Sequence, residues 1–359
     1  MPASSSPPLP EPTPDRPRRR WLLRLVAAAA GVIVLLALVA GGAAWWGQRE
    51  YVKPGPLAAA KIVIIPKGAG LDDIAERLAA NGVIQRPIVF RVAARLEDKA
   101  HLLKAGEYEF QAAISQEAVI RQLIEGRTVL HRLTVAEGLT TAEVLQIVAR
   151  AGPLDGTVTE KPAEGALLPE TYNFARGDSR NVLVQRMTKA MSDTLDQLWA
   201  KRAEGLPFKT KAEALILASI VEKETGIAAE RPRVAAVFVN RLRRGMRLDS
   251  DPTVIYGLTN GQGPLNRPLL TKDLEIKTPY NTYQIDGLPP GPIANPGRAA
   301  IEATLNPAPT KDLFFVADGT GGHVFSETLD QHNRNVARWR ALQRERRNDA
   351  NQRGVETQK

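Results

Sequence analysis

Two glutamates end a run of apolar and small residues in the middle of the chain. Leu215 to Val221 contains no charged residue, and Glu222, Lys223 and Glu224 follow it directly. A helix that is apolar on every side belongs in a protein interior, where a carboxylate is costly unless it has a partner or a task. Burial and the negative end of the helix dipole both favour the protonated carboxyl, which is the form that a general acid needs.

The two glutamates lie on different faces of this predicted helix. Glu222 shares a face with Ala218 and Ser219, and such small residues leave room for a ligand. Glu224 shares a face with bulkier aliphatic residues, which indicates a structural role. Glu222 is therefore the candidate catalytic acid. The alternative is an ion pair at the helix end, for example with Arg231.

Other carboxylates could complete a catalytic pair. Glu170 lies in a predicted loop, and Asp249 and Asp251 flank Ser250. A hydrolase with two carboxylates would need one of them roughly 5–10 Å from Glu222. The alternative is that these residues cap turns or helices.

Aromatic and amide side chains gather in the loops that follow the helices. Tyr256, the run from Tyr280 to Tyr283, and Asn295 are the main examples. Aromatic faces combined with amide and hydroxyl groups suit a saccharide groove, although loop tyrosines also pack as lids over a core.

Motifs for other chemistries are absent from the sequence. The chain has no cysteine, and His323 and His332 do not have a metal-ligand spacing. There is no nucleophile elbow, phosphate-binding loop or dinucleotide fingerprint. We therefore expect no metal and no cofactor.

The net charge of +9 is concentrated at the two ends of the chain. Residues 1–24 and 334–359 carry nearly all of it, so the middle of the protein is close to neutral. A nucleic-acid binder would carry basic residues along a folded face, and this distribution predicts no nucleic-acid partner.

The N-terminal region predicts a membrane anchor. A Pro- and Ser-rich segment, which is expected to be disordered within a cytoplasmic tail (1–20), ends in an arginine cluster. No charged residue occurs from Leu25 to Trp46, and tryptophans lie at both ends of the predicted transmembrane helix (21–46). The arginines place the N-terminus in the cytoplasm and the rest of the chain outside it. A cleaved signal peptide is the alternative.

The remaining chain predicts an α+β protein. After a linker (47–58), a strand, a tight turn and a helix resemble the LysM module, a small β-α-α-β fold that binds N-acetylglucosamine polymers. A second copy of the pattern is expected near His131, and the LysM-like domain spans 59–150. Its role is either to bind glycan or to act as a spacer. A mainly helical catalytic domain with a loop- and strand-containing C-terminal half is expected over 151–345, followed by a basic disordered tail (346–359).

Several segments together carry a family resemblance. They are ASIVEKET at 218–225, VFVNRL at 237–242, GMRLDSDPTV at 245–254, YNTY at 280–283, GLPPGPI at 287–293, NPG at 295–297, FVADG at 315–319, His323, His332 and Asn333, and LPETY at 168–172. The chain resembles the endolytic murein transglycosylases, the MltG or YceG-like family. Asp249 departs from the family, which commonly has Gln there.

The resemblance implies a bacterial inner-membrane lyase with an extracytoplasmic catalytic domain. It implies cleavage of peptidoglycan strands between N-acetylmuramic acid and N-acetylglucosamine, leaving 1,6-anhydro-muramyl ends and limiting the length of nascent strands. The catalytic Glu of the family corresponds to Glu222. The candidate substrate-binding residues are Glu170, Ser219, Asn240, Asp251, Thr253, Tyr256, Tyr280, Asn281, Tyr283 and Asn295.

Two other functions stay open at this point. One is a non-catalytic, membrane-anchored peptidoglycan-binding scaffold for cell-wall synthases such as the penicillin-binding proteins. The other is a hydrolase that uses Asp249 or Glu170 as its second carboxylate.

Overall fold

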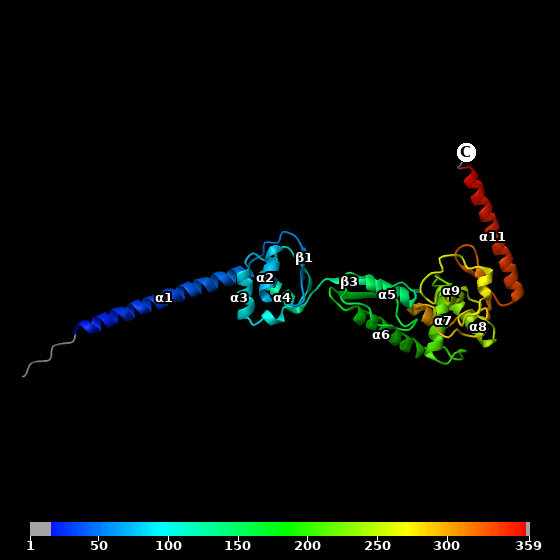
Figure 1. Cartoon of the computed structure of the whole chain (residues 1–359), viewed down its shortest axis with the longest axis horizontal. Coiled ribbons are helices and arrows are strands. Elements are labelled where there is room, and N and C mark those ends of the chain that lie inside the picture. Colours follow the sequence, from blue (N-terminus) through cyan, green and yellow to red (C-terminus); the bar gives the residue numbers. More distant parts are fainter. Residues whose placement is uncertain (1–15, 357–359) are drawn as a thin grey trace, which may run out of the picture. The chain divides into compact units, whose positions relative to one another are not determined.

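The computed structural model describes residues 16–356 of the chain, and side chains are described for 21–346. The chain forms two compact units, which meet between Val129 and Leu130 (Figure 1). Small antiparallel sheets combine with many helices, so the predicted α+β class is confirmed. Most of the N-terminal segment that was predicted to be disordered, residues 1–15, lies outside the described residues.

The first unit begins with the long helix α1 (Arg16–Val52). Its part from Trp21 to Val52 is long and apolar enough to cross a membrane. The helix already includes residues 16–20 of the predicted tail and continues past the predicted end of the span at Trp46. Because Tyr51 is buried against the rest of the unit, the last turns of α1 are held by packing. The linker therefore begins at Lys53 rather than at residue 47.

In the rest of the first unit, helices pack against one antiparallel pair of strands. β1 (Lys61–Ile65) pairs antiparallel with β2 (Gly106–Phe110), and α2 (Leu71–Ala80), α3 (Pro87–Leu96) and the short helix η1 (Ala100–Leu102) lie between them in the chain. Helix α4 (Gln116–Glu125) follows. The predicted strand–turn–helix pattern is present here, and apolar side chains from both strands and from α2, α3 and α4 form one core.

The predicted second copy differs from the first. β3 (Leu130–Thr134) pairs antiparallel with β4 (Thr171–Ala175), and between them the chain forms one helix, α5 (Thr141–Arg150), and a long loop. This pairing ties residues 130–150 to the second unit, so the boundary defined by contacts comes before the predicted boundary at 150. β4 was predicted as a loop because its strand pattern is short and its partner is distant in the sequence.

Helix α7 (Lys211–Glu224) is the central element of the second unit. It packs against α6 (Arg180–Trp199), α8 (Arg231–Arg243), α9 (Asp251–Thr259) and α10 (Arg298–Leu305). The Thr210 hydroxyl accepts a hydrogen bond from the amide of Glu213, and the Glu213 carboxylate accepts one from the amide of Thr210. This capping box stabilises the start of the helix. Helix α9 was predicted as a loop because Pro252 suggested a turn, whereas it lies in the first turn of the helix.

The C-terminal part adds the short helix η2 (Thr271–Glu275), a strand pair and a last helix. β5 (Phe314–Ala317) pairs antiparallel with β6 (His323–Ser326), which agrees with the strands expected in the C-terminal half. Helix α11 (Leu329–Glu356) packs against both strands. The predicted disordered tail, 346–359, is thus helical as far as Glu356.

Candidate active site

Glu222 lies in the last turn of α7, directly after five fully buried residues, Leu217 to Val221. Its side chain is only 6% exposed. The helix ends at Glu224 because Thr225 adopts an extended conformation. The carboxyl of Glu222 is therefore buried because the apolar residues that precede it in α7 pack in the core.

Two donors from other elements face this carboxyl. The amide of Gly297 donates to Oε2 of Glu222 at 2.9 Å, and Gly297 is the N-cap of α10. Nη2 of Arg231, at the start of α8, lies 3.7 Å from Oε1. Both are groups that stabilise a negative charge, since one is at a helix N-terminus and the other is a guanidinium.

The turn after β3, residues 136–138, lies against the carboxyl of Glu222 and the side chain of Arg231. Nη2 of Arg231 also lies 3.8 Å from Oε2 of Glu137, and the amide of Gly138 donates to the carbonyl of Asn295 at 3.0 Å. Nζ of Lys223 donates to the carbonyl of Gly138 at 3.0 Å. The structure places this turn against Glu222 and the α10 N-terminus.

The protonation of Glu222 is set by opposing effects. Burial raises the pKa of its carboxyl above the ordinary range, and the hydrogen bond from the Gly297 amide opposes this rise. The nearby charge of Glu137 raises the pKa further, whereas Arg231 and Lys223 lower it. A buried carboxyl with a raised pKa and cationic or N–H groups at hand can release a proton and then hold the resulting charge.

Glu224 lies in a separate polar cluster on the other side of the helix end. Oγ of Ser250 donates a short hydrogen bond to its Oε1. Burial raises the pKa of Glu224 to about 7, and the Ser250 bond opposes that rise. Burial thus raises the pKa of both glutamates, but their hydrogen-bond partners differ: Glu222 is bound by the Gly297 amide and Glu224 by the Ser250 hydroxyl.

The aspartates that flank Ser250 have partners of their own. Oδ2 of Asp249 lies 3.1 Å from Nη1 of Arg241, and its backbone has a positive φ of 48°. The Tyr283 hydroxyl donates to Oδ1 of Asp251 at 2.7 Å. Burial raises the pKa of Asp249, and Arg241 opposes this. The aspartate that replaces the common Gln of the family is thus ion-paired with Arg241.

Tyr256 and Tyr280 pack together beside a cavity. Their ring centroids are 4.7 Å apart, and the Tyr256 hydroxyl donates to Oε2 of Glu164 at 3.3 Å. Glu164 was not predictable as a site residue because nothing in its local sequence marks it. It is half-buried, and this burial raises the pKa of its carboxyl. The cavity measures about 570 Å³ and is lined by Thr140, Glu143, Lys223, Pro252, Ile255, Tyr256, Thr259, residues 263–267 and Ile293. Because Lys223 lines this cavity and follows Glu222 directly in the chain, the cavity lies beside the end of α7.

The other predicted binding residues make hydrogen bonds to the protein itself. The Asn295 side chain accepts from the Leu167 amide at 2.8 Å and donates to the Leu139 carbonyl at 3.0 Å. The other amides and hydroxyls likewise bond to nearby loops or to their own helix: Asn240 to Thr310 and Asp312, Asn281 to Leu274 and Ile276, Ser219 to Ile216 and Ile293, Thr253 to Ser250 and Thr282.

Glu170 is exposed at the start of β4. Its carbonyl accepts from the Val135 amide, and its carboxylate lies within 3.5 Å of the Thr171 amide. The structure therefore gives Glu170 local contacts in the β3–β4 region. Among the residues that the structure describes, no cluster of three or more His, Cys, Asp or Glu could hold a metal ion.

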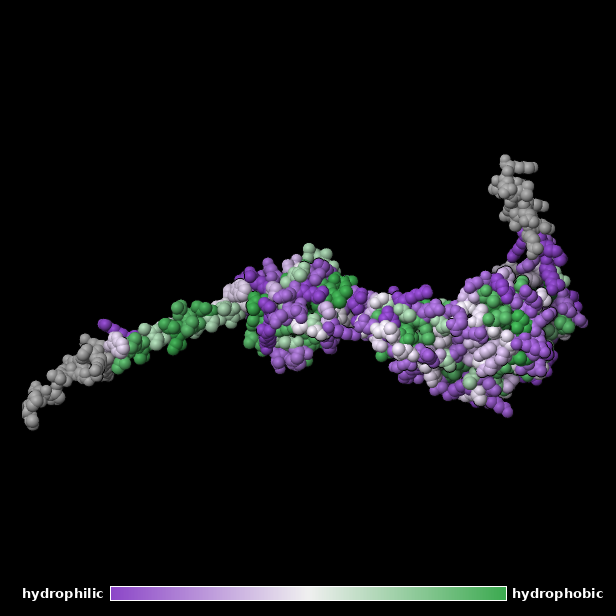
Figure 2. Space-filling view, in the orientation of Figure 1, coloured by the Kyte–Doolittle hydropathy of each residue, from purple (hydrophilic) through white to green (hydrophobic). Residues whose placement is uncertain are grey.

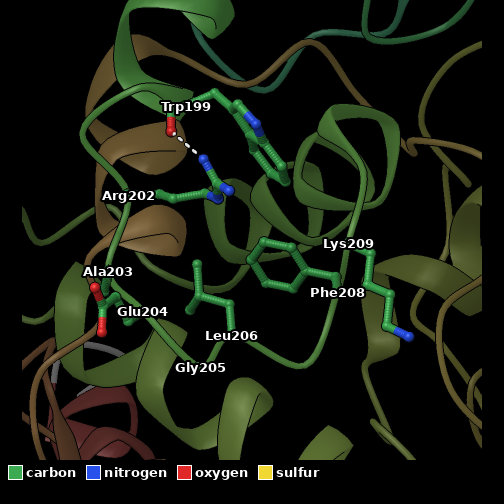
Figure 3. Close-up of a pocket in the computed structure, with 8 residues that line it drawn as sticks. All are labelled: Trp199, Arg202, Ala203, Glu204, Gly205, Leu206, Phe208 and Lys209. Atoms are coloured by element: carbon green, nitrogen blue, oxygen red, sulfur yellow. Dashed lines mark hydrogen bonds between the residues drawn. The ribbon is translucent and has the colours of Figure 1, made fainter.

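A second cavity, of about 580 Å³, lies between α6 and the start of α7 (Figure 3). Arg202 stacks on the Trp199 ring with 4.2 Å between its Cζ and the ring centroid, and Nη1 donates to the Trp199 carbonyl. The guanidinium therefore covers one face of the indole. Lys209 of this cavity precedes α7, whereas Glu222 is in its last turn, about 20 Å away along the helix.

Comparison with known proteins shows which family has this arrangement. Residues 63–338 match the model of the YceG-like family, and the chain belongs to that family. A relative from Bacillus subtilis named endolytic murein transglycosylase is 33% identical over 303 residues, which cover 75% of this chain and 82% of the relative.

Two further proteins are similar to this chain. A Streptococcus pneumoniae protein with the same name is 31% identical over 325 residues, and the match covers 76% of this chain but 57% of that protein. The crystal structure of a YceG-like protein from Listeria monocytogenes has 30% identity and a TM-score of 0.46, and the match covers 77% of this chain and 99% of that one.

Proposed function

We propose that this chain is an endolytic peptidoglycan lytic transglycosylase. The observation that carries the proposal is the buried carboxyl of Glu222, held between the Gly297 amide and Arg231 at the end of the signature helix of the family. Relatives of similar sequence are named endolytic murein transglycosylases. The substrate would be the glycan strand of peptidoglycan, and no metal or cofactor enters the reaction.

Glu222 would act first as an acid and then as a base. Its proton passes to the oxygen of the bond between N-acetylmuramic acid and N-acetylglucosamine, and the C1–O bond breaks as positive charge develops at C1. The resulting carboxylate accepts the proton of the muramyl C6 hydroxyl, whose oxygen bonds to C1 and closes a 1,6-anhydro ring. Water does not attack, so a second carboxylate is unnecessary.

The neighbours of Glu222 fit both halves of this cycle. Burial favours the protonated acid before the bond breaks. After proton transfer, the Gly297 amide and the Arg231 guanidinium stabilise the carboxylate. The same residue can therefore serve as acid and base near neutral pH.

The cavity beside Lys223 is the proposed saccharide groove. Tyr256 and Lys223 line it, and Tyr280 supports Tyr256 by ring packing. We assign positioning roles to the residues whose polar groups bond to the protein, namely Ser219, Asn240, Thr253, Asn281 and Asn295. Asp251 and Tyr283 hold each other at the start of α9, and Glu170 remains a candidate for contact with the strand outside the cavity.

The first unit would anchor the enzyme and present the glycan. Helix α1 would cross the inner membrane with its arginine cluster in the cytoplasm, so that both globular units are extracytoplasmic. The order β1, α2, α3, β2 supports a LysM-like module, whose proposed role is to bind the glycan strand or to space the catalytic unit from the membrane.

Digestion of purified sacculi tests the proposal. Wild-type protein should release muropeptides with 1,6-anhydro ends, which mass spectrometry identifies because hydrolysis products are one water heavier. Glu222→Gln should fold and release none, whereas the matched control Glu302→Gln, at an exposed position of α10, should behave as wild type.

The other outcomes discriminate among the alternatives. Undiminished release by Glu222→Gln would remove Glu222 from the mechanism. Reducing ends would indicate a hydrolase with Asp249 or Glu170 as its second carboxylate. Binding of sacculi by the wild type without any cleavage would indicate a scaffold for cell-wall synthases.

A further inference from the structure

Helix α3 carries an apolar stripe that the core of its unit does not cover. Ile88, Val92 and Leu96 are 55%, 46% and 82% exposed, and their spacing of four residues puts them on one helical face. Phe90 and Ala94 on the opposite face, and Val89 beside the stripe, are buried in the core of the unit, which does not include the three exposed side chains. Three large aliphatic residues in line on a surface mark an interaction site.

The stripe lies beside the end of the membrane-crossing helix. An apolar groove of about 510 Å³ runs between α1 and α3. Its lining is formed on one side by Ala43, Ala44, Trp46, Gly47, Gln48 and Tyr51, and on the other by Ile88, Val89, Val92, Ala93, Leu96 and Glu97. Figure 2 shows hydrophobic residues on the side of the unit from which α1 leaves. Contacts of α1 with both α3 and α4 hold the two sides of the groove together.

The position of the groove along α1 indicates its depth in the bilayer. The uncharged stretch from Leu25 to Trp46 is about 33 Å long as a helix, which matches the hydrocarbon core of a bilayer. The groove begins at Ala43 and continues past Trp46, so it lies at the level where that core ends and the headgroups begin. Aromatic and arginine side chains suit this level, and Cζ of Arg86 lies 5.2 Å from the Trp46 ring centroid.

Charged residues border the stripe as they do in helices that lie on membranes. Arg91 and Arg95, on the flank of the stripe, have aliphatic stems that can lie along an apolar surface while their charged ends reach the headgroups. Both pair with the exposed Asp72 at 3.1 and 3.4 Å, so their guanidinium groups already lie at the polar edge of α3.

We propose that α3 lies in the membrane interface, with Ile88, Val92 and Leu96 among the lipid acyl chains. The occupant of the groove between α1 and α3 is thus lipid. The inference rests on the membrane anchoring of α1 proposed above and is independent of the chemistry at Glu222. It gives the first unit a fixed face toward the bilayer, held by α1 and α3 together.

Site-specific fluorescence quenching tests this placement. Because the sequence contains no cysteine, the fluorophore attaches only at the cysteine that is introduced. The full chain is reconstituted into vesicles of phosphatidylethanolamine and phosphatidylglycerol, with bimane attached at Leu96→Cys. In one set of vesicles some lipids carry a nitroxide on the acyl chain close to the headgroup, and in a second set they carry it near the end of the chain, at the depth of Leu35. Leu35→Cys in α1 reports insertion of the anchor. Ile62→Cys, on the solvent side of β1 and 51% exposed, is the matched aliphatic control.

We expect the nitroxide to quench bimane at Leu96 and at Leu35 several-fold more than at Ile62. Adding Val92→Glu should lower the quenching at Leu96 toward that at Ile62 and leave quenching at Leu35 unchanged. Since Val92 is exposed, the variant should retain its fold, which circular dichroism checks.

Three results would overturn the inference. Quenching at Leu96 no greater than at Ile62, with Leu35 quenched, would leave the anchor intact and remove α3 from the membrane, as expected if the stripe binds a helix of another membrane protein. Equal quenching at Leu96 with and without Val92→Glu would also contradict it. An unquenched Leu35 would overturn the anchor and this inference together, while digestion of sacculi by the same proteins scores the catalytic proposal separately.

Discussion

The carboxylate of Glu137 lies directly over the Cα of Gly297. A β-carbon added to Gly297 would lie 1.8 Å from Oε1 of Glu137, although the φ of Gly297, −74°, is one that any residue adopts. A side chain at this position therefore fits the backbone conformation but requires the half-exposed side chain of Glu137 to move. Because the amide of this glycine holds Glu222, the contact connects the turn after β3 to the proposed acid.

Gly297→Ala should consequently displace Glu137 and weaken the hydrogen bond to Glu222. We expect a lower kcat in sacculus digestion and a loss of no more than about 1 kcal/mol in the free energy of unfolding, because the half-exposed side chain of Glu137 can turn away from the added carbon. Glu137→Ala combined with Gly297→Ala should recover much of the stability, because truncating Glu137 removes the clash. Additive losses in a double-mutant cycle would contradict the proposed contact.

The charges around Glu222 predict opposite shifts of the pH–activity profile. The general acid must be protonated, so activity falls as the pH rises through the pKa of Glu222. Glu137→Gln removes a charge that raises this pKa, and the alkaline limb should move to lower pH. Arg231→Met removes a charge that lowers the pKa, and the limb should move to higher pH.

Measurement of kcat/KM across pH with a soluble glycan-strand substrate decides this prediction. Thermal melts of both variants separate a true shift from loss of fold, since Arg231 is buried. Shifts in the same direction, or none in either variant, would show that Glu222 does not set the alkaline limb.

The central helix and its acid were predictable because their signal is local. Seven apolar or small residues followed by Glu222 predict a buried helix that ends in a carboxyl, and α7 has that form. Arg231 was named from the sequence as a possible ion-pair partner, and it lies 3.7 Å from Glu222, but the other partner was not predictable in the same way. The Gly297 amide is 75 residues from Glu222, and nothing in the local sequence around either residue encodes their contact.

The loop amides show a different limit of sequence reasoning. An asparagine in a Gly- and Pro-rich loop suits a sugar hydroxyl, and it suits a backbone amide equally well. Asn281 and Asn295 are completely buried and bond to backbone groups, which a sequence without coordinates cannot distinguish from a ligand-binding role. Helix α9 and strand β4 were missed because a proline and a distant strand partner conceal short elements.

Asn295 should contribute strongly to stability. Asn295→Ala leaves the buried amide of Leu167 without its partner and removes one of the two hydrogen bonds to the Leu139 carbonyl, which still accepts from the backbone amide of residue 295. The loss should cost about 1–3 kcal/mol in the free energy of unfolding. Urea denaturation measures the loss, with the exposed Asn306→Ala as the control. A loss in the Asn295 variant no larger than in the control would mean that water or a rearranged loop replaces both bonds.

Glu224 should make the protein less stable as the pH rises toward neutrality. Its pKa is about 7 in the folded protein because of burial, against about 4.3 in an unfolded chain. Between these values the folded state keeps a proton that the unfolded state has released. The free energy of unfolding therefore falls as the pH rises through this window and levels off above it, by a total on the order of 3 kcal/mol.

Glu224→Gln should remove that dependence. The amide oxygen of the glutamine can still accept from the Ser250 hydroxyl, so the variant should match the wild type near pH 5 and exceed it in stability at pH 8. Urea titrations at several pH values, with Glu302→Gln as the exposed control, measure the difference. Parallel pH profiles for the wild type and Glu224→Gln would contradict the assignment, because they would mean that Glu224 is already ionised in the folded protein at pH 5.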